Sequence, residues 1–228
     1  MSNSASARST DTTLSVSNLR VGYGGEDVIQ GMSLKLAAGE MVALVGRNGI
    51  GKTTLMRAVA GEIRVNGGSV MLLGQDITGL PTHKRHKLGL MYIPEGGGVI
   101  SALTVREHFR LCQSNSPEDI FDQRMTLARG LFPSLSERLD QYGSALSGGE
   151  RQILSITLAY LFRPKLLLMD EPTSGLSPSN ISKIGDLIAL VKSETSILAS
   201  SQNDATLKNI TDRTLAMQFN KVTAISSP

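Results

Sequence analysis

The hydrophobic and polar positions of this chain follow two periods, and the change between them divides the sequence. Alternation with a period of two predicts half-buried strands at residues 14–21 and 28–36. Apolar runs without alternation predict strands buried on both faces at 41–45 and 166–169. Between about 102 and 163 the apolar positions instead recur at helical spacing. The pattern therefore predicts an α/β core into which a helical segment is inserted.

The remaining elements follow from the same two periods and from the turn residues that bound them. Further strands are expected at 69–73, 88–93 and 195–199, and a closing hairpin at 213–218 and 221–225 turns at Phe219-Asn220. Helices are expected at 55–60, 81–87, 105–112, 117–130, 134–140, 151–162 and 179–192. Outside the insertion strands and helices alternate, so the expected core is a parallel sheet covered by helices.

The division into domains follows from these elements. Residues 1–13 are rich in Ser and Thr, so we expect a disordered leader and not a signal peptide. One domain is expected at 14–228, with a core at 14–100 and 164–228 and a helical subdomain at about 101–163. No apolar run approaches the roughly 18 residues of a membrane-spanning helix. We therefore expect a protein that reaches a membrane only through a partner.

The strongest chemical signal is the glycine-rich stretch GRNGIGKTT at residues 46–54, between a predicted strand and a predicted helix. Glycines allow successive N–H groups to turn toward an anion, and a helix start adds unpaired donors with a partial positive charge. Lys52 is expected to reach the β- and γ-phosphates, and the Thr53 hydroxyl to bind Mg²⁺. The predicted nucleotide-binding residues here are Gly46, Asn48, Gly49, Gly51, Lys52, Thr53 and Thr54. A glycine-rich turn without a ligand is the alternative.

Two carboxylates follow the buried strand at 166–169. Asp170 and Glu171 lie where that strand ends, and open α/β sheets bind ligands at this edge. Asp170 is expected to hold Mg²⁺ together with Thr53, directly or through water. Glu171 is the candidate catalytic residue that orients and polarises an attacking water molecule.

Three other features are ambiguous by themselves. Tyr23 lies between glycines and is either a turn tyrosine or a platform for a flat base. Ser147, Gly148 and Gly149 at a helix start are either a cap or a second anion-binding terminus. The sequence Pro-Glu-Gly-Gly-Gly at 94–98 indicates a loop that flexes or approaches another segment closely.

Composition narrows the classes of partner. The net charge of +3, with a sequence pI near 9.1, is spread out and gives little support for nucleic-acid binding. The single Cys112 excludes an intrachain disulfide, and we expect it to act as a small apolar side chain on a helix. His83 and His86 lie among three cations and indicate a solvated basic face, not a metal site.

Three motifs occur in an order that is very specific: residues 46–54, then LSGGERQ at 146–152, then LLLMDE at 166–171. Over about residues 14–225 the chain resembles the nucleotide-binding domain of ABC transporters. The resemblance implies an α/β fold with a RecA-like P-loop NTPase core, an N-terminal antiparallel β subdomain and an inserted α-helical subdomain. It also implies an ATPase reaction with ATP and Mg²⁺.

The resemblance assigns roles to the ambiguous residues. It implies that Tyr23 stacks on adenine. It also implies that Ser147, Gly148 and Gly149 contact the γ-phosphate held by a second ATP-binding subunit, in a homodimer or heterodimer that encloses two ATP molecules. Glu95 stands where the family usually has Gln beside the nucleotide.

A second departure concerns the position where the family usually has His, which is Gln202 here. Its neutral side chain can donate a hydrogen bond to the γ-phosphate but does not become charged, so Glu171 should matter more. Together, Gln202, Glu95 and the sequence Gly-Leu-Ser-Pro at 175–178 make the chain resemble the ATP-binding subunits of branched-chain amino acid importers and of related urea and amide importers. Ser201 and the glycines at 97–98 fit that branch less well.

The expected function is therefore ATP hydrolysis that drives import of branched-chain amino acids or a related small polar solute. The expected partners are a second ATP-binding subunit, transmembrane permease subunits that contact Glu95 and the helical insertion, and indirectly a periplasmic or extracellular solute-binding protein. The expected location is the cytoplasmic face of the inner (plasma) membrane, as a peripheral subunit. Two alternatives remain: a weakly hydrolysing regulatory ABC protein and an ABC ATPase that acts with nucleic acid.

Overall fold

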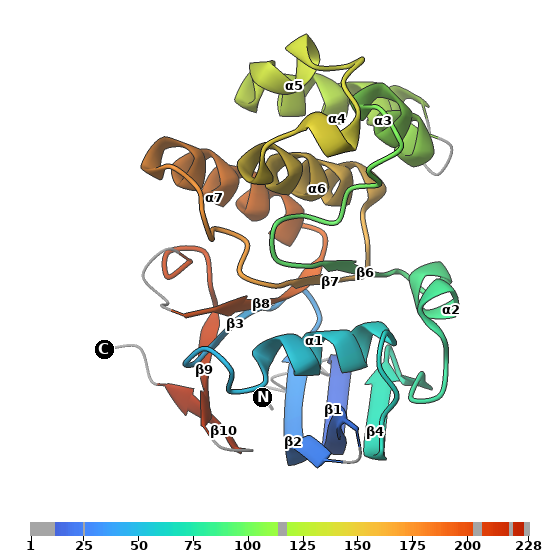
Figure 1. Cartoon of the computed structure of the whole chain (residues 1–228), viewed down its shortest axis with the longest axis vertical. Helices are drawn as coiled ribbons and strands as arrows, with labels where there is room; N and C mark the ends of the chain where they lie inside the picture. Colours follow the sequence, from blue (N-terminus) through green and yellow to red (C-terminus); the bar gives the residue numbers. More distant parts are fainter. Residues whose placement is uncertain (1–11, 25, 114–117, 203–206, 219–220, 226–228) are drawn as a thin grey trace, which may run out of the picture.

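The chain folds into two sheets with helices between and around them (Figure 1). A computed structural model describes residues 12–24, 26–113, 118–202, 207–218 and 221–225. In Figure 1, α6 (Gly148–Phe162) and α7 (Pro178–Lys192) lie above a six-stranded sheet, and α1 (Lys52–Ala60) lies between that sheet and a four-stranded one. This is the layered α/β arrangement that the alternation of elements predicts.

The six-stranded sheet has the order β10-β9-β3-β8-β7-β6. Its strands are β10 (Lys221–Ile225), β9 (Arg213–Gln218), β3 (Met41–Val45), β8 (Ser196–Ser201), β7 (Leu166–Met169) and β6 (Leu90–Ile93). All neighbouring pairs are parallel except β10 with β9. The carboxyl ends of β3, β8, β7 and β6 therefore meet at one edge, where ligands of open α/β sheets bind.

Strand β7 shows why its sequence lacks alternation. Leu167 and Met169 pack into the hydrophobic core under α6 and α7, whereas Leu166 and Leu168 pack into the core around α1. Both faces are fully buried, so both must be apolar. Asp170 follows at the end of this strand and is 1% exposed.

The four-stranded antiparallel sheet has the order β2-β1-β4-β5. Its strands are β2 (Glu26–Ala37), β1 (Thr12–Tyr23), β4 (Gly67–Leu72) and β5 (Gln75–Asp76), the last of which the sequence pattern did not predict. β1 begins inside the segment that we expected to be a leader, because the Thr13 hydroxyl bonds the buried Ser196 hydroxyl at 2.9 Å. The rest of that expected leader, residues 1–11, lies outside the described residues.

The helical segment comprises α3 (Val105–Gln113), α4 (Glu118–Leu131), α5 (Pro133–Glu137), the short 3₁₀ helix η1 (Gly143–Ala145) and α6. Cys112 is buried on α3, and burial raises the pKa of its thiol to about 12, which agrees with its expected role as a small apolar side chain. No helix of the described residues is long and apolar enough to cross a membrane. The predicted turn at Phe219-Asn220 lies outside the described residues.

The predicted basic face of α2 (Thr82–Lys87) is wrong for one residue. Arg85 is 2% exposed, and its guanidinium donates to the carbonyl oxygens of Leu80, Thr78, Ala58 and Val59 at 2.7–2.9 Å. Two of these carbonyls belong to the last turn of α1, where the Ala58 carbonyl also accepts from the Gly61 N–H at 3.2 Å. Arg85 therefore caps α1 from another element.

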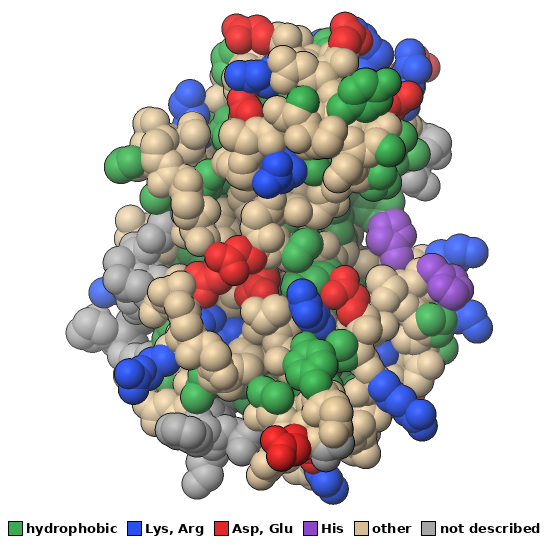
Figure 2. Space-filling model, in the orientation of Figure 1, with side chains coloured by type: hydrophobic (Ala, Val, Ile, Leu, Met, Phe, Trp, Pro, Cys, Tyr) green, Lys and Arg blue, Asp and Glu red, His purple; other side chains and the backbone are tan. Residues whose placement is uncertain are grey.

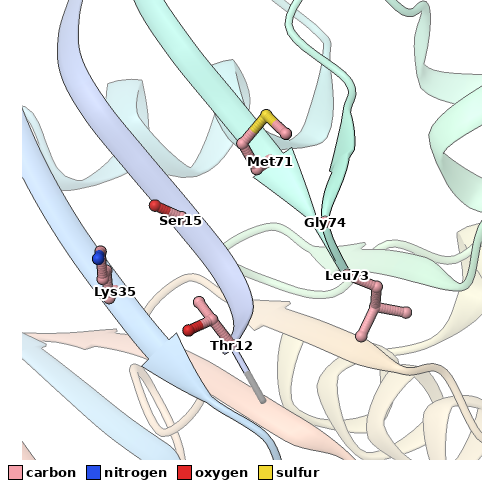
Figure 3. Close-up of a pocket in the computed structure, with 6 residues that line it drawn as sticks. All are labelled: Thr12, Ser15, Lys35, Met71, Leu73 and Gly74. Atoms are coloured by element: carbon pink, nitrogen blue, oxygen red, sulfur yellow. The ribbon is translucent and has the colours of Figure 1, made fainter. Parts of the chain in front are cut away.

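A pocket of about 580 Å³ lies on the outer face of the antiparallel sheet (Figure 3). Its lining residues are Thr12, Ser15, Lys35, Met71, Leu73 and Gly74. None of them is acidic, and Lys35 provides the charge. Although this pocket is larger than the cleft at the phosphate loop, its side chains do not combine the acids and helix donors that phosphate chemistry needs.

Candidate active site

The loop between β3 and α1 has the backbone that an anion site requires. Gly49 and Gly51 have φ angles of 77° and 107°, in the left-handed region that favours glycine. Gly51 is the N-cap of α1, no side chain caps the helix, and its first turn carries no acid. The N–H donors at this helix start are therefore available to a ligand.

Lys52 lies at the floor of this loop and is 6% exposed. Its Nζ atom donates to the Gly46 carbonyl at 2.7 Å and to the Arg47 carbonyl at 3.4 Å. The same atom lies 3.3 Å from Oε1 of Glu171, but this carboxylate oxygen has no directed hydrogen bond. The contact between Lys52 and Glu171 is therefore mainly Coulombic, and it joins the phosphate loop to the end of β7.

A cleft of about 310 Å³ opens over these residues. Its lining consists of Asn48, Gly49, Gly51, Lys52, Thr53, Thr54, Glu95, Glu171 and Gln202. On the face shown in Figure 2, acidic side chains gather at the middle of the molecule, between the helical part and the sheets. Four segments that are far apart in the sequence thus bring nine of the predicted site residues to one cleft.

The two acidic residues after β7 are hydrogen-bonded to Ser200 of the neighbouring strand β8. Glu171 adopts a left-handed φ of 47°, and its N–H donates to the Ser200 hydroxyl at 3.0 Å. The same hydroxyl donates to Oδ1 of Asp170. The backbone N–H of Gln202 donates to Oε2 of Glu171 at 3.2 Å. Ser200 was not among the predicted site residues.

Glu95 reaches the cleft from the loop after β6. Its Oε1 atom accepts a hydrogen bond from the Ser174 hydroxyl at 3.1 Å. The predicted close approach of this loop is also present: a Cβ atom on Gly97 would lie 2.7 Å from the Arg151 carbonyl carbon and oxygen. The N–H of Gly98 donates to the Ser155 hydroxyl on α6 at 2.9 Å.

Tyr23 lies at the end of β1, outside the residues that line the cleft. Its side chain is 49% exposed, and its hydroxyl is hydrogen-bonded to Arg57 on α1, which raises the pKa of that guanidinium. The half-exposed ring thus lies near α1, the helix that follows the phosphate loop. Its contact with adenine stays a prediction.

The residues Ser147, Gly148 and Gly149 do not line the cleft of their own chain either. Here the cap interpretation holds: the Ser147 hydroxyl accepts from the Glu150 N–H at 3.3 Å, and Oε2 of Glu150 accepts from the Ser147 N–H at 2.8 Å. Burial raises the pKa of Glu150, but the hydrogen bonds with Ser147 and the charge of Arg138 outweigh it and lower that pKa. The γ-phosphate contact stays a prediction.

Sequence reasoning missed Ser174, which lies in the turn after β7, and it missed Ser200 because strand ends are hard to place. We expected the strand to end at Ala199, which left Ser200 in a loop, whereas β8 continues to Ser201. The available signal was a serine directly after the apolar residues Ile197, Leu198 and Ala199, since a hydroxyl that is buried at the end of such a strand needs partners.

An apolar groove of about 440 Å³ lies between α2, the loop after β6 and the helical segment. It is lined by His86, Met91, Gly98, Ile100, His108, Leu111, Cys112, Leu158 and Phe162. Ile100 and Leu111 are 52% and 53% exposed, which is unusual for large apolar side chains on adjacent segments. The His86 ring lies 4.8 Å from the Phe162 ring, so His86 is not simply solvated.

Comparison with known proteins identifies the family of the chain. Residues 29–174 match the family model of the ABC transporter. The chain is 32% identical over 210 residues to the high-affinity branched-chain amino acid transport ATP-binding protein BraG of Pseudomonas aeruginosa, covering 92% of this chain and 90% of the relative. It is 31% identical over 218 residues to the lipopolysaccharide export system ATP-binding protein LptB of Haemophilus influenzae, covering 94% and 90%.

Solved structures agree with the sequence comparison. The structure of an ATP-binding subunit of an ABC transporter superposes with a TM-score of 0.83 at 28% identity, covering 94% of this chain and 90% of the other. A nucleotide-free ATP-binding cassette superposes with a TM-score of 0.76 at 22% identity and supports the fold alone. The chain therefore belongs to the ABC transporter family, as an ATP-binding subunit that hydrolyses ATP.

Proposed function

We propose that ATP binds in the cleft at the phosphate loop and that Lys52, Glu171 and Gln202 perform its hydrolysis. The observation that supports this most is the meeting of an uncapped helix start, a buried ammonium and a carboxylate in one cleft. The helix donors and Lys52 would hold the β- and γ-phosphates, since both favour negative charge. Tyr23 would stack on the adenine ring.

The water-activating role falls to Glu171. Its Oε1 atom is buried without a hydrogen-bond partner, so it is available to accept a proton or a water O–H. Gln202 comes directly after β8 and would donate a hydrogen bond to the γ-phosphate from its neutral amide. Attack in line with the leaving group then needs positioning and charge neutralisation.

A magnesium ion fits the oxygen atoms at this edge of the sheet. Asp170 is a buried carboxylate, Thr53 lines the cleft with its hydroxyl, and Glu95 adds a second carboxylate. Hard oxygen ligands of this kind suit Mg²⁺. We propose that Thr53 and Asp170 hold the ion, which when bound neutralises charge on the phosphates.

The test of this proposal is the variant Glu171→Gln, which keeps the shape of the side chain but loses its basicity. Turnover should fall by at least about a hundredfold while ATP affinity is retained, because the carboxylate acts on the water and not on binding. The measurements are phosphate release and equilibrium binding of a fluorescent ATP analogue. Glu118→Gln on the exposed side of α4 is the control, and unchanged turnover in Glu171→Gln would contradict the role.

We also propose that two ATP-binding subunits close around the nucleotides. Ser147, Gly148 and Gly149 lie on the surface and outside the cleft, so they are free to approach the γ-phosphate of a facing subunit. The Glu171→Gln variant with ATP should accumulate as a dimer in light scattering. A variant that binds ATP and stays monomeric at all concentrations would count against the dimer.

The apolar groove with Ile100 and Leu111 is the proposed contact with transmembrane permease subunits at the cytoplasmic face of the membrane. A helix from a membrane subunit would bury these exposed side chains. Replacing Ile100 with Asp should abolish co-purification with membrane partners and leave ATP binding by the isolated chain intact. Equal recovery of permease with Ile100→Asp would exclude the groove as the contact.

For the transported solute, we propose branched-chain amino acids or a related small polar compound such as urea or an amide, delivered by a solute-binding protein. The support is the similarity to BraG and to the probable branched-chain amino acid transport protein LivF of Archaeoglobus fulgidus, 32% identical over 206 residues. The similarity to LptB favours a second candidate, lipopolysaccharide export. Uptake of labelled leucine and urea in a deletion strain, with lipopolysaccharide transport measured in parallel, separates the candidates.

A weakly hydrolysing regulator is the other alternative, because Gln202 stands where the family usually has His. Glu171 in the cleft argues against it. Steady-state phosphate release, with and without membrane partners, distinguishes a transport ATPase from a regulator that binds ATP and turns it over slowly.

A further inference from the structure

Ser200 connects the two acids of the proposed site through one hydroxyl group. The side chain is 0% exposed, at the carboxyl end of β8. Its oxygen accepts from the Glu171 N–H at 3.0 Å and its O–H donates to Oδ1 of Asp170. β8 lies between β3 and β7, so this hydroxyl sits at the centre of the sheet edge that carries the cleft.

The hydrogen bond to Glu171 acts on a strained backbone. A non-glycine residue in the left-handed region persists only where its surroundings hold it. Glu171 has a φ of 47°, and the bond from its N–H to Ser200 fixes the orientation of the peptide that enters this residue. That orientation sets the direction in which the Glu171 carboxylate leaves the backbone, toward Lys52 and the Gln202 N–H.

The hydrogen bond to Asp170 acts on the rotation of a buried carboxylate. A hydroxyl that donates to one oxygen holds the plane of the group, and a partner of this kind commonly orients a metal ligand. Only a side chain with both a donor and an acceptor on one atom can serve Glu171 and Asp170 together. Alanine or valine at this position would leave both without that partner.

We propose that Ser200 is a positioning residue for ATP hydrolysis, which fixes the Asp170 carboxylate and the Glu171 backbone relative to each other. The inference rests on the proposed roles of Asp170 and Glu171. It predicts that the loss of one hydroxyl group slows the chemical step and weakens the contribution of Mg²⁺, with little effect on nucleotide binding in the absence of the metal ion.

The same strand provides a matched control at its other end. Ser196 is also buried, and its hydroxyl also makes two hydrogen bonds, to the Thr13 hydroxyl and from the Gly39 N–H, each at 2.9 Å. The bond with Thr13 joins the two sheets, and both bonds lie at the amino end of β8, away from the cleft. Ser196→Ala therefore removes a comparable buried hydroxyl without touching the acids.

The experiment compares Ser200→Ala, Ser200→Thr and Ser196→Ala. Because a buried hydrogen bond to a charged group is strong, kcat of Ser200→Ala should fall about tenfold while KM for ATP stays within about twofold. Equilibrium binding of a fluorescent ATP analogue should be unchanged without Mg²⁺, and the gain in affinity on adding Mg²⁺ should shrink. Ser200→Thr keeps the hydroxyl and should recover most of kcat.

Three results would overturn the inference: wild-type kcat in Ser200→Ala, an equal fall in Ser196→Ala, or no recovery in Ser200→Thr. If Ser200→Ala does not fold, Ser200→Cys preserves the volume with a weakly bonding thiol, and a kcat equal to wild type in that variant has the same meaning. Asp170→Asn and Glu171→Gln are measured alongside. If they retain turnover, the proposed function fails; if they lose it while Ser200→Ala does not, only the role of Ser200 fails.

Discussion

The starts of α1 and α6 are both glycine-containing helix N-termini, but they satisfy their N–H donors in opposite ways. The start of α1 has Gly51 as its N-cap, with no side-chain cap and no acid in its first turn. The start of α6 has a complete capping box from Ser147 and Glu150, and it carries a carboxylate. A helix start that the chain leaves uncapped has N–H donors available for an anion, whereas a capped one has satisfied some of them within the chain.

Each helix start also has an ion-paired carboxylate nearby, and the two carboxylates belong to different elements. Glu171 lies next to α1 but is paired with the Lys52 ammonium, so the local charge at the loop is nearly balanced. Glu150 is part of α6 itself, and Arg138 pairs with it at 2.7 Å. We infer that α1 provides most of the affinity for the triphosphate and that α6 contributes only when a second subunit brings it to the γ-phosphate.

The largest effect that would test the comparison is expected from Lys52→Ala. If Lys52 binds phosphate as proposed, removing its buried ammonium should lower ATP affinity at least about a hundredfold, since charge-assisted hydrogen bonds are the strong ones and each factor of ten is about 1.4 kcal/mol. Equilibrium binding of a fluorescent ATP analogue measures it. The control is Lys192→Ala, which removes another hydrogen-bonded lysine, paired with Asp212, and should lower stability but not ATP affinity. Equal affinities in Lys52→Ala and wild type would refute an anion site at α1.

A substitution at the C-terminal end of α1 should change the stability of the fold but not the affinity for ATP. Arg85→Met removes the buried charged donor to four carbonyls, two of them at the end of α1, so the free energy of unfolding should fall by about 2–3 kcal/mol. Chemical denaturation measures this change. Lys84→Met, on the exposed side of α2, is the matched control and should have little effect. If both variants unfold alike, Arg85 does not cap α1.

A third prediction separates capping from anion binding at α6. Ser147→Ala removes the cap and should lower the free energy of unfolding by about 1 kcal/mol. Ser147→Asp restores a good N-cap but adds negative charge, so it should recover stability while weakening ATP-driven dimer formation in the Glu171→Gln background. Thermal unfolding and light scattering measure the two properties. Full dimer formation by Ser147→Asp would argue that α6 does not meet phosphate.

The smallest expected effect is the loss of stability at low pH that comes from Glu150. The folded pKa of Glu150 lies below its usual value of 4.5, so its contribution to stability is present above about pH 4.5 and is lost as the pH falls through the folded pKa. Glu150→Gln should therefore lower the free energy of unfolding at pH 7 by about 0.5 kcal/mol. The effect is small because Arg138 is partly exposed and solvent screens the ion pair. The difference from wild type should shrink near pH 3. Urea denaturation at both pH values measures it. A constant difference would mean that the charge of Glu150 plays no part.

The parts of the site that sequence predicted are those whose chemistry is local. The phosphate loop at 46–54 and the acids Asp170 and Glu171 each follow a buried strand directly, so neighbouring residues define them. The layered fold was predicted for the same reason, since each element carries its own period. Boundaries were less accurate: α6 begins at Gly148 and not at residue 151, because the two glycines and Ser147 join the helix through the capping box.

What sequence did not predict are polar contacts between distant segments. Arg85 bonds a carbonyl 27 residues away, and Ser200 bonds Asp170 across 30 residues. Their residue types are ordinary for a surface helix and a loop, and only the packing of α2 on α1 and of β8 on β7 reveals their partners. The choice between cap and anion site at Ser147 likewise depended on the rotamer of Glu150.

The glycine loop after β6 has a mechanical consequence. At Gly97 the loop backbone rests directly on the backbone of α6, with no side chain between them, and the Gly98 N–H is pinned to Ser155. Two main chains in such contact have no rotamers to absorb a displacement. A tilt of the helical segment would therefore displace the loop that carries Glu95. The shape of the cleft is therefore coupled to the orientation of the helical segment through this backbone contact.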